Sequence, residues 1–389
     1  MNNDLVYIDL SYHSLNKYGE ELCGDKVEIV KTKDKTIIVL ADGLGSGVKA
    51  NILATLTSKI MITMLEKGAN LKETIDTITN TLPVCSIRQL AYSTFSILEI
   101  DNQLKCRIIE FDNPPTFVVR DHKIVELSKE VFYSSGKKVL ISEIDLKVGD
   151  ELTLCSDGVI HAGVGRFLNH GWEWVHVAEF LVKQRLNSAA NLNRRLIESC
   201  NRLYDEKPGD DTTAVTVKIK LPQKIHLFTG PPEDETLDHD LIKNFMREEG
   251  KKIVCGGTAA NIVSRELNRE IITDISYIDP NIPPMAIIKG IDLVTEGVLT
   301  LKMVLDRLRE INKNCVDFVL TKEDAVSKLL KYFIEDSTHI YFSVGHAINP
   351  AHQNPDFPEE LSIKINVVRD LIEELKIMGK IVILQYTDR

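Results

Sequence analysis

The stretch TIIVLADGLGSGVKAN, residues 36–51, passes from a run of β-branched and apolar residues into an acid, three glycines and the start of a helical pattern. Such an apolar run is typical of a buried strand. It ends at Asp42, which Gly43 follows. An Asp-Gly pair after a strand usually forms a turn, because both residues tolerate a positive φ. The other interpretation is a metal site, and the remaining acids of the sequence have to decide between the two.

The bulk composition is that of an ordinary globular protein. The chain has 389 residues, of which 43% are hydrophobic and 27% charged, and its formal net charge is -10. Because this length exceeds what one hydrophobic core usually organises, we expect two domains. The negative charge gives no general attraction to nucleic acid or to anionic lipid. An acidic substrate therefore has to be held by a bound cation or by backbone amides.

Cysteine usage and the N-terminal stretch indicate a cellular compartment. Seven cysteines are scattered without a C-x-x-C pair, which favours free thiols in a reducing cytosol. The start, MNNDLVYIDLSYH, has acids among its apolar residues and does not resemble a signal peptide. No apolar run approaches the roughly 20 residues of a membrane span. We expect a cytoplasmic protein that binds neither membrane nor nucleic acid.

The first half of the chain is rich in short strands. Helical periodicity appears in separated pairs of segments, which predicts helices packed outside a sandwich of two sheets, an α+β fold. The predicted strands are 36–41, 93–100, 103–112, 115–120, 123–127, 138–142, 151–155 and 212–220. The predicted helices are 47–67, 71–81, 173–185 and 188–204.

The pattern changes after TTAVTVKIKLPQK, and Pro222 is the predicted seam between a domain of residues 1–221 and one of residues 222–389. From Lys224 onward strand and helix alternate, which predicts an α/β domain with a mainly parallel sheet. Its predicted strands are KIHLF, KKIVC, HIYFSV and KIVILQY, and its predicted helices are 237–249, 258–267, 298–311 and 360–378.

Further acids stand at strand ends in the first domain. Asp157 follows the run in ELTLCSDGV, Asp210 and Asp211 precede the run in PGDDTTAVTVKIK, and Asp25 in GEELCGDKVEIV leads into another run. A sheet brings such ends together, and clustered carboxylates repel one another unless a cation neutralises them. Hard oxygen ligands in this number select Mg²⁺ or Mn²⁺. The set of acids therefore favours a metal site over four unrelated turns.

At this point the sequence resembles a known family. ADGLGSG at 41–47, SDGV at 156–159 and GDDTTAV at 209–215 look, in this order, like the metal motifs of the PPM (protein phosphatase 2C-like) serine/threonine phosphatases. The bacterial branch typified by the sporulation stage II E phosphatases is the most similar. The resemblance covers roughly residues 10–220 and does not extend to 224–389.

The resemblance implies a site with two divalent cations, Mn²⁺ or Mg²⁺. Asp42 would bridge the two ions, and the carbonyl of Gly43 would bind one of them directly or through water. Asp157 and Asp210 would complete the shell of the other ion. An activated water would then attack a phosphomonoester, so that no protein nucleophile is needed.

The match is looser at three further positions. Asp25 stands where the family has an acid near its start that holds one ion, and Asp211 is better assigned to hydrogen bonding around the ligands. Several relatives have a histidine two residues after the bridging acid, where this chain has Leu44. The acid that protonates the leaving alcohol is therefore unassigned, with a metal-bound water as the default.

Other catalytic arrangements find little support. No C-x₅-R follows any thiol, and we interpret Cys155 as a buried strand residue. His161 has no zinc-like spacing to another histidine and is interpreted as a loop residue. Trp172 and Trp174 are predicted to pack at a helix start, with a substrate-facing role as the alternative.

The second domain offers a candidate anion site. Gly256, Gly257 and Thr258 in IVCGGTAANIV begin a helix after a strand, where free amides favour phosphate or carboxylate groups. LFTGPPED and KGIDLVTEG occupy similar places, and the simpler interpretation is a set of tight connections. Residues 342–358 form a connection long enough for a lid or a partner loop. We expect a regulatory domain that binds a small molecule or nucleotide.

Two functions remain open. The first is a metal-dependent phosphatase that removes phosphate from phosphoserine or phosphothreonine of a regulatory protein. The alternative is a signalling or binding protein with a vestigial metal site, whose C-terminal domain senses a ligand.

Overall fold

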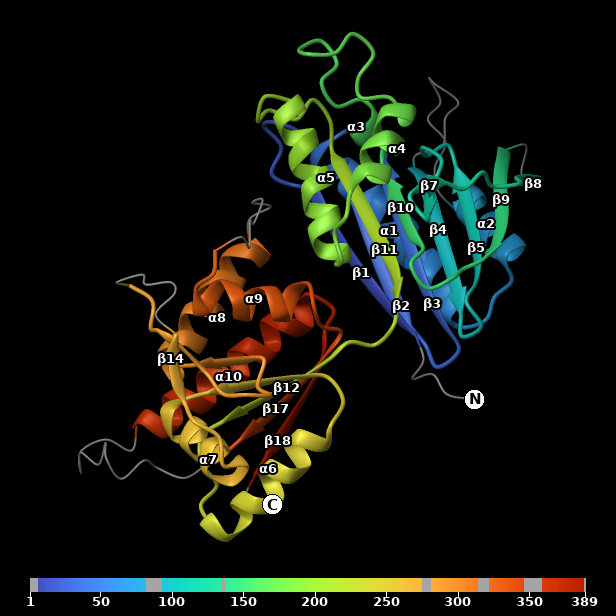
Figure 1. The fold of residues 1–389 in the computed structure, drawn as a ribbon. Helices are drawn as coiled ribbons and strands as arrows, with labels where there is room; N and C mark the ends of the chain where they lie inside the picture. Colours follow the sequence, from blue (N-terminus) through green and yellow to red (C-terminus); the bar gives the residue numbers. More distant parts are fainter. Residues whose placement is uncertain are drawn as a thin grey trace. The chain divides into compact units, whose positions relative to one another are not determined.

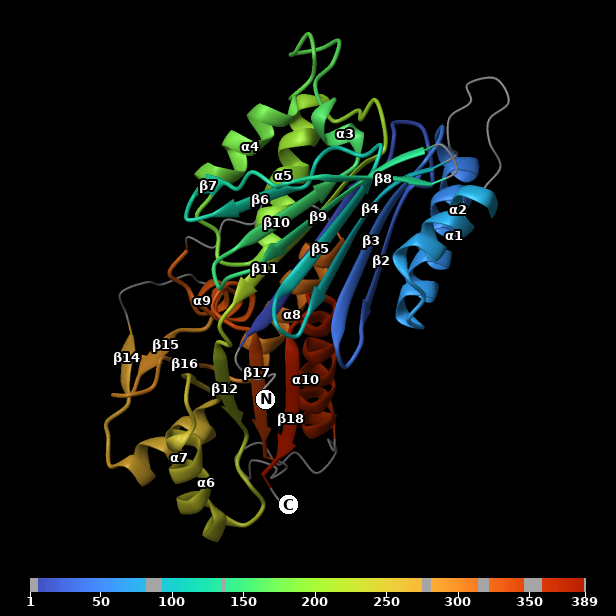
Figure 2. The same ribbon diagram turned by 90° about the vertical axis from the view of Figure 1, so that its right-hand side faces the viewer.

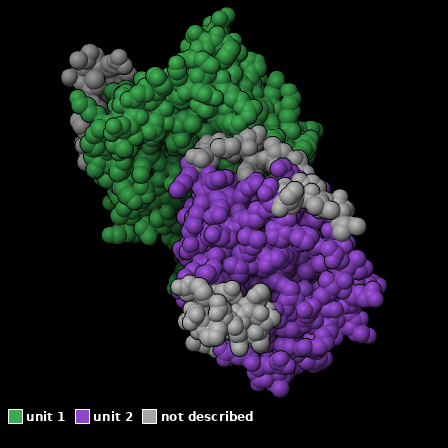
Figure 3. All heavy atoms as spheres, turned by 90° about the vertical axis from the view of Figure 1, so that its left-hand side faces the viewer, with its two compact units in different colours: residues 1–221 green, residues 222–389 purple. Residues whose placement is uncertain are grey.

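A computed structural model of the chain describes residues 6–81, 93–134, 137–274, 281–313, 322–345 and 359–387. The residues divide into two compact units, unit 1 from Met1 to Leu221 and unit 2 from Pro222 to Arg389 (Figure 3). Each unit has its own sheets and its own hydrophobic core, so the two are described separately.

Unit 1 contains two stacked antiparallel sheets. In spatial order, the five-stranded sheet consists of β1 (Tyr7–Leu15), β11 (Thr212–Lys220), β10 (Glu151–Cys155), β6 (Phe117–Arg120) and β7 (Lys123–Ile124). The six-stranded sheet consists of β2 (Asp25–Lys31), β3 (Lys35–Gly43), β4 (Ser93–Asp101), β5 (Lys105–Phe111), β9 (Lys137–Asp145) and β8 (Glu130–Ser134). Apolar side chains from both sheets, such as Leu40 and Val215, form the core between them.

Helices cover the outer faces of both sheets. The six-stranded sheet carries α1 (Gly47–Glu66) and α2 (Leu71–Thr81), and the five-stranded sheet carries α4 (Trp174–Lys183) and α5 (Ala189–Leu203). Figure 2 shows the sheets between these two helical layers. A short helix, α3 (Asp157–Ile160), follows β10. The predicted αββα sandwich is therefore confirmed.

The sequence analysis missed two strands of this sandwich, β1 and β8. β1 alternates between buried and more exposed residues, from Tyr7 and Asp9 outward, and it pairs along its whole length with β11. Its partner lies about two hundred residues away in the sequence. Polar residues within it, among them Asp9 and His13, hide the strand from a search for apolar runs.

Helix α1 is apolar on nearly all sides. Ala54, Met61 and Leu65 are buried against the six-stranded sheet, whereas Val48, Ile52 and Leu56 form an exposed row. By length and composition alone, α1 is long and apolar enough to cross a membrane, which the sequence analysis did not anticipate. In unit 1 it packs on β2 and β3 as a core helix.

Unit 2 contains a seven-stranded sheet. In spatial order its strands are β14 (Ile272–Asp274), β15 (Met285–Ile287), β16 (Leu293–Thr295), β13 (Lys251–Cys255), β12 (Lys224–Thr229), β17 (His339–Val344) and β18 (Ile381–Tyr386). Five neighbouring strands, from β16 to β18, run parallel, and β14 and β15 add an antiparallel edge. The prediction of a mainly parallel sheet is therefore confirmed.

Helices cover both faces of this sheet (Figure 1), and each face has a separate hydrophobic core. One face carries α6 (Asp238–Arg247) and α7 (Gly257–Leu267), and the other carries α8 (Val298–Lys313), α9 (Ala325–Ile334) and α10 (Glu359–Ile377). The sequence analysis missed α9 and the short strands β14 to β16. Each short strand has only three residues, which is too few for a periodic signal.

Candidate active site

Two of the predicted site residues face each other on neighbouring strands. Asp25 is the first residue of β2, and it lies directly opposite Asp42 in the register of β2 and β3. Asp25 is 4% exposed, and Asp42 is half-buried. Like charges directly opposite on a sheet destabilise it. The fold thus places two carboxylates side by side at a cost that a bound cation would remove.

The other predicted acids come from the second sheet. Asp157 begins α3 just after β10, and Asp210 and Asp211 immediately precede β11. β10 and β11 are antiparallel neighbours with Cys155 opposite Ala214, so the end of one and the start of the other lie together. All five acids therefore stand at the same end of the sandwich.

Ser156 joins the two groups of acids. Its hydroxyl donates a hydrogen bond of 2.7 Å to Oδ2 of Asp25 and accepts one of 2.9 Å from the backbone N–H of Thr213. Its own N–H donates to the carbonyl of Thr213 over 2.9 Å. Ser156 is fully buried, so these bonds fix a carboxylate of one sheet to the backbone of the other.

Two carboxylate oxygens of the site are buried without a hydrogen-bond partner. They are Oδ1 of Asp25 and Oδ2 of Asp211. A Cβ atom on Gly24 would lie 2.7 Å from the second of them, so only glycine permits this close approach. Unpaired buried acceptors are costly. Their presence beside other carboxylates fits a site that binds a cation.

Electrostatic repulsion within the cluster appears as raised pKa values. Burial, followed by the charges of Asp25, Asp157, Asp210 and Asp211, raises the pKa of Asp42 to about 9. Burial, followed by the charges of Asp211 and Asp157, raises the pKa of Asp25 to about 7. The pKa of Asp210 is raised by burial and by Asp157. The five acids therefore act on one another as a single cluster.

The carboxylate oxygens of the cluster are suitable ligands for a hard divalent cation, but their present positions do not yet surround one. Carboxylate oxygens are the ligands that Mg²⁺ and Mn²⁺ prefer. Within the described part of the chain, however, no three His, Cys, Asp or Glu side chains converge closely enough to hold an ion as they stand. Because carboxylates without a counter-ion repel one another, the half-buried side chains of Asp42, Asp157 and Asp210 would have to turn inward on binding.

Gly43 lies under the start of α1. A Cβ atom at this position would lie 2.0 Å from the carbonyl oxygen of Ala50, so a side chain does not fit without moving the helix. The N–H of Gly43 donates to the carbonyl of Gly24 over 3.1 Å. Leu44, where relatives carry a histidine, is half-buried. The carbonyl of Gly43 follows Asp42 directly, as the resemblance requires for a ligand.

Sequence reasoning missed the residues that support the acids. Ser156 stood in the quoted SDGV motif without a role. The backbone N–H of Lys17 donates to Oδ1 of Asp211 over 3.0 Å, and the Tyr204 hydroxyl donates to the carbonyl of Gly158 over 2.7 Å. Neither Lys17 nor Tyr204 belongs to a motif, so no sequence signal marks them.

Three of the four residues set aside in the sequence analysis pack inside unit 1 or at a helix start, and the fourth, His161, does not. Cys155 is buried within β10, and His161 is exposed. Trp174 begins α4, stacks on Phe117 with ring centroids 4.8 Å apart, and donates from Nε1 to the carbonyl of Pro115. Trp172 packs edge-on against a ring of α4. The prediction that both tryptophans pack at a helix start is confirmed.

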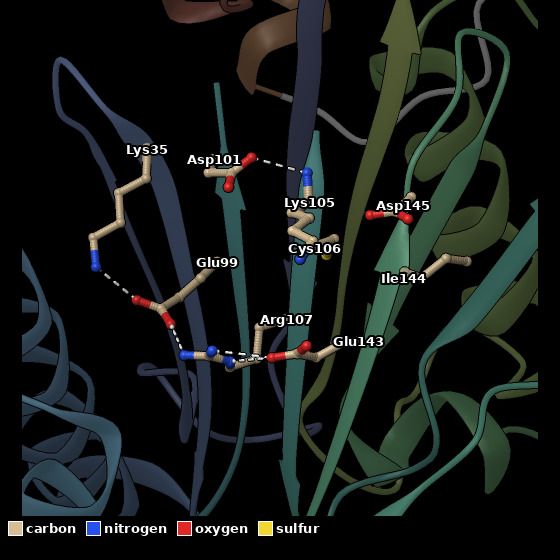
Figure 4. Close-up of a pocket in the computed structure, with 9 residues that line it drawn as sticks. All are labelled: Lys35, Glu99, Asp101, Lys105, Cys106, Arg107, Glu143, Ile144 and Asp145. Atoms are coloured by element: carbon tan, nitrogen blue, oxygen red, sulfur yellow. Dashed lines mark hydrogen bonds and ion pairs between the residues drawn. The ribbon is translucent and has the colours of Figure 1, made fainter. Parts of the chain in front are cut away.

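A cavity of about 480 Å³ in unit 1 lies away from the acids. Four of its charged side chains form ion pairs: Lys35 contacts Glu99, and Arg107 contacts both Glu99 and Glu143 (Figure 4). Lys35 begins β3 and Asp42 stands near its end, a span of roughly 23 Å at the usual rise of a strand. The cavity therefore belongs to the opposite end of the sheet.

The proposed anion site of unit 2 has the geometry of a tight connection. Gly256 has a φ of 115° and links β13 to α7, and a Cβ atom on Gly297 would lie 3.3 Å from its Cα atom. Gly257 and Thr258 form the first turn of α7. No observation of the described residues supports a ligand there. Residues 346–358, most of the suggested lid, lie outside the described residues.

A second cavity, of about 510 Å³, lies in unit 2 beside Lys224 and Lys251, the first residues of β12 and β13. It is thus at the amino ends of these parallel strands. Because ligands of open α/β sheets bind beyond the carboxyl ends of the strands, this cavity lies at the end of the sheet opposite to the usual ligand site.

Comparison with known proteins defines the class of unit 1. One similar solved structure is the PP2C phosphatase domain and a fragment of the regulatory domain of SpoIIE from Bacillus subtilis, with a TM-score of 0.50 and 22% identity, covering 56% of this chain and 63% of that one. The phosphatase domain of the same protein in another crystal form gives a TM-score of 0.44 at 23% identity, covering 56% of this chain and 94% of that one. Unit 1 has the PP2C phosphatase fold.

The family is more specific than the fold. Residues 32–220 match the model of the family described as Stage II sporulation protein E (SpoIIE), and unit 1 therefore carries a SpoIIE-family domain. Stage II sporulation protein E of Bacillus subtilis (strain 168) is 26% identical over 212 residues, which are 52% of this chain and 24% of that protein. The chain thus spans about a quarter of the length of that curated relative. The resemblance stated from the motifs is confirmed, and unit 2 lies outside the matched residues.

Proposed function

We propose that unit 1 is a Mn²⁺- or Mg²⁺-dependent protein phosphatase that removes phosphate from phosphoserine or phosphothreonine. One observation carries this proposal: acids from two sheets meet at one place. Asp25 lies opposite Asp42 in one sheet. Ser156 hydrogen-bonds both Asp25 and the start of β11, the strand that follows Asp210 and Asp211. The fold and the family are those of phosphatases. A phosphorylated regulatory protein is the proposed substrate, by analogy with the branch that the motifs resemble.

Each acid has a proposed role in holding the ions. Asp25, Asp42, Asp157 and Asp210, together with the carbonyl of Gly43, would hold the ions. When bound, two divalent ions would supply an activated water and neutralise charge on the phosphoryl oxygens. Ser156 fixes the orientation of Asp25, and Asp211 fixes the loop before β2 through the N–H of Lys17.

Hydrolysis of p-nitrophenyl phosphate and of a phosphothreonine peptide, with and without Mn²⁺, tests the proposal. We expect Mn²⁺-dependent turnover in the parent chain, and a loss of at least about a hundredfold in Asp42→Asn and Asp157→Asn with the fold retained by circular dichroism. Asp205→Asn, an exposed acid paired with Arg166, is the matched control and should keep its activity.

The outcomes separate this proposal from its alternative. Equal turnover in the parent chain and in both variants would exclude the acid cluster as the active site. A parent chain that Mn²⁺ stabilises against heat, but that hydrolyses neither substrate, would favour the alternative of a signalling protein with a structural metal site. No observation in the described residues of unit 2 supports a specific ligand for that alternative.

A further inference from the structure

Lys17 is the cation nearest to the acid cluster among the described contacts. Its Nζ lies 3.9 Å from Oδ1 of Asp210, and the two side chains are 38% and 45% exposed. The charge of Lys17 also lowers the pKa of Asp210, against burial and the charge of Asp157, which raise it. An ammonium group thus stands at the open side of an otherwise acidic site.

The backbone of Lys17 is anchored while its side chain is not. The Lys17 N–H donates to Oδ1 of Asp211 over 3.0 Å, and the next N–H, that of Tyr18, donates to the carbonyl of Pro208 over 2.8 Å. These bonds hold the loop between β1 and β2 against the loop that carries Asp210. In contrast, the contact of Nζ is long and half-exposed, so the ammonium can exchange Asp210 for another anion.

Charge balance explains why such a group is needed. Five ionised carboxylates with two divalent ions leave about one negative charge at the site, and a phosphomonoester dianion adds about two more. The ions reverse the sign only locally, so a further cation at the rim favours the incoming phosphate. A lysine on a flexible stem can supply it as a mobile point charge.

We propose, resting on the phosphatase function above, that Lys17 is a positioning residue that leaves Asp210 and contacts a non-bridging phosphoryl oxygen of the substrate. Asp210 then turns towards an ion as its partner departs. Lys17 acts in binding, and the departing alcohol takes no proton from it. The residue type that matters is a cation, so arginine should replace it.

The test compares Lys17→Met, Lys17→Arg and a matched control, Lys207→Met, which removes another lysine of the same pair of loops, one whose Nζ lies over the Tyr18 ring. With p-nitrophenyl phosphate and saturating Mn²⁺, we expect KM to rise about tenfold in Lys17→Met while kcat changes less than about threefold. Lys17→Arg should have a KM close to that of the parent chain, and Lys207→Met should have the same KM and kcat as the parent chain.

Two readouts without turnover accompany the kinetics. In thermal shift, Lys17→Met should bind Mn²⁺ at least as tightly as the parent chain, because no ammonium competes for Asp210. Stabilisation of the Mn²⁺-loaded protein by inorganic phosphate should need about tenfold more phosphate in Lys17→Met. An unchanged KM together with an unchanged phosphate response overturns the proposal, as does weaker Mn²⁺ binding that accounts for the whole loss.

Failure of the inference and failure of the proposed function give different results. A parent chain without turnover contradicts the phosphatase function, yet the phosphate response of the Mn²⁺-loaded protein still decides whether Lys17 binds phosphate. A parent chain with full turnover and a Lys17→Met variant identical to it in every assay contradicts the inference alone.

Discussion

The hydroxyl of Ser156, one residue beyond β10, hydrogen-bonds Oδ2 of Asp25, the first residue of β2, and so connects the two sheets of unit 1. The two residues are 131 positions apart in the sequence. This bond orients a carboxylate that otherwise has one oxygen without a partner. The support of the candidate metal site is therefore a contact between sheets.

Ser156→Ala should weaken metal binding without unfolding unit 1. Groups that orient a metal ligand typically contribute 10–100-fold in affinity, so we expect the Mn²⁺ concentration for half-maximal thermal stabilisation to rise by about that factor. Ser58→Ala, at a fully buried serine of α1, is the matched control and should leave this concentration unchanged. Equal Mn²⁺ responses in the two variants would show that Ser156 has no such role.

Asp25→Asn should separate metal binding from stability. The substitution removes a like charge opposite Asp42, so without metal the melting temperature should stay the same or rise, and the stabilisation by Mn²⁺ should be lost. Asp150→Asn should do the opposite. Asp150 is 1% exposed and accepts hydrogen bonds from Arg120, so its loss should lower the melting temperature and preserve the Mn²⁺ response. A lower melting temperature of metal-free Asp25→Asn would contradict this account.

Gly43→Ala should disturb the junction between β3 and α1. The added Cβ atom would lie 2.0 Å from the carbonyl oxygen of Ala50, so we expect a loss of about 1–3 kcal/mol in the free energy of unfolding and weaker Mn²⁺ binding. At Gly209, near the same site, the added atom would lie 3.5 Å from the Tyr204 ring, an ordinary contact. Urea unfolding of Gly43→Ala and Gly209→Ala measures the difference, and equal stabilities would refute the steric argument.

Two leucines of α1 should respond differently to the same substitution. Leu65 is 1% exposed and belongs to the core under the helix, whereas Leu56 is 48% exposed. Leu65→Ala should lower the free energy of unfolding by about 2–5 kcal/mol, whereas Leu56→Ala should change it by no more than about 0.5 kcal/mol. Urea unfolding of the isolated chain tests both. A large cost for Leu56→Ala would mean that its row of apolar side chains is covered in solution.

His13 should make unit 1 less stable in mild acid. Burial, and then the positive charge of Arg194, lower the pKa of His13 below its usual value, against a hydrogen bond to Asn193 that raises it. Because the folded pKa lies below the unfolded value of about 6.5, the unfolded chain takes up the proton first as the pH falls. The contribution of His13 to the stability of unit 1 is therefore present above about pH 6.5, and it is lost as the pH falls through the folded pKa of His13.

The comparison for this prediction is the change in melting temperature between pH 7.5 and pH 5.5. The change should be smaller in His13→Gln than in the parent chain, because glutamine does not titrate. His176→Gln, at an exposed histidine of α4, should behave like the parent chain. The same pH dependence in all three proteins would remove His13 as the cause.

Sequence alone was sufficient for the main features of both units. Apolar runs and helical periodicity depend on neighbours within a few residues, which is why α1, α5 and four of the five parallel strands of unit 2, all but β16, were predicted close to their observed bounds. The positions of Asp42, Asp157 and Asp210 at strand ends are also local properties, and they were enough to indicate the metal motifs.

Tertiary structure alone decided how these parts meet. The register of β2 and β3 places Asp25 opposite Asp42. A hydrogen bond joins Lys17 to Asp211, which are 194 positions apart in the sequence. β1 was missed because its strand character comes from pairing with β11, which lies at the other end of the sequence of unit 1. Contacts of this kind depend on which segments the folded core brings together, and the local pattern of residues does not encode that choice in any readable form.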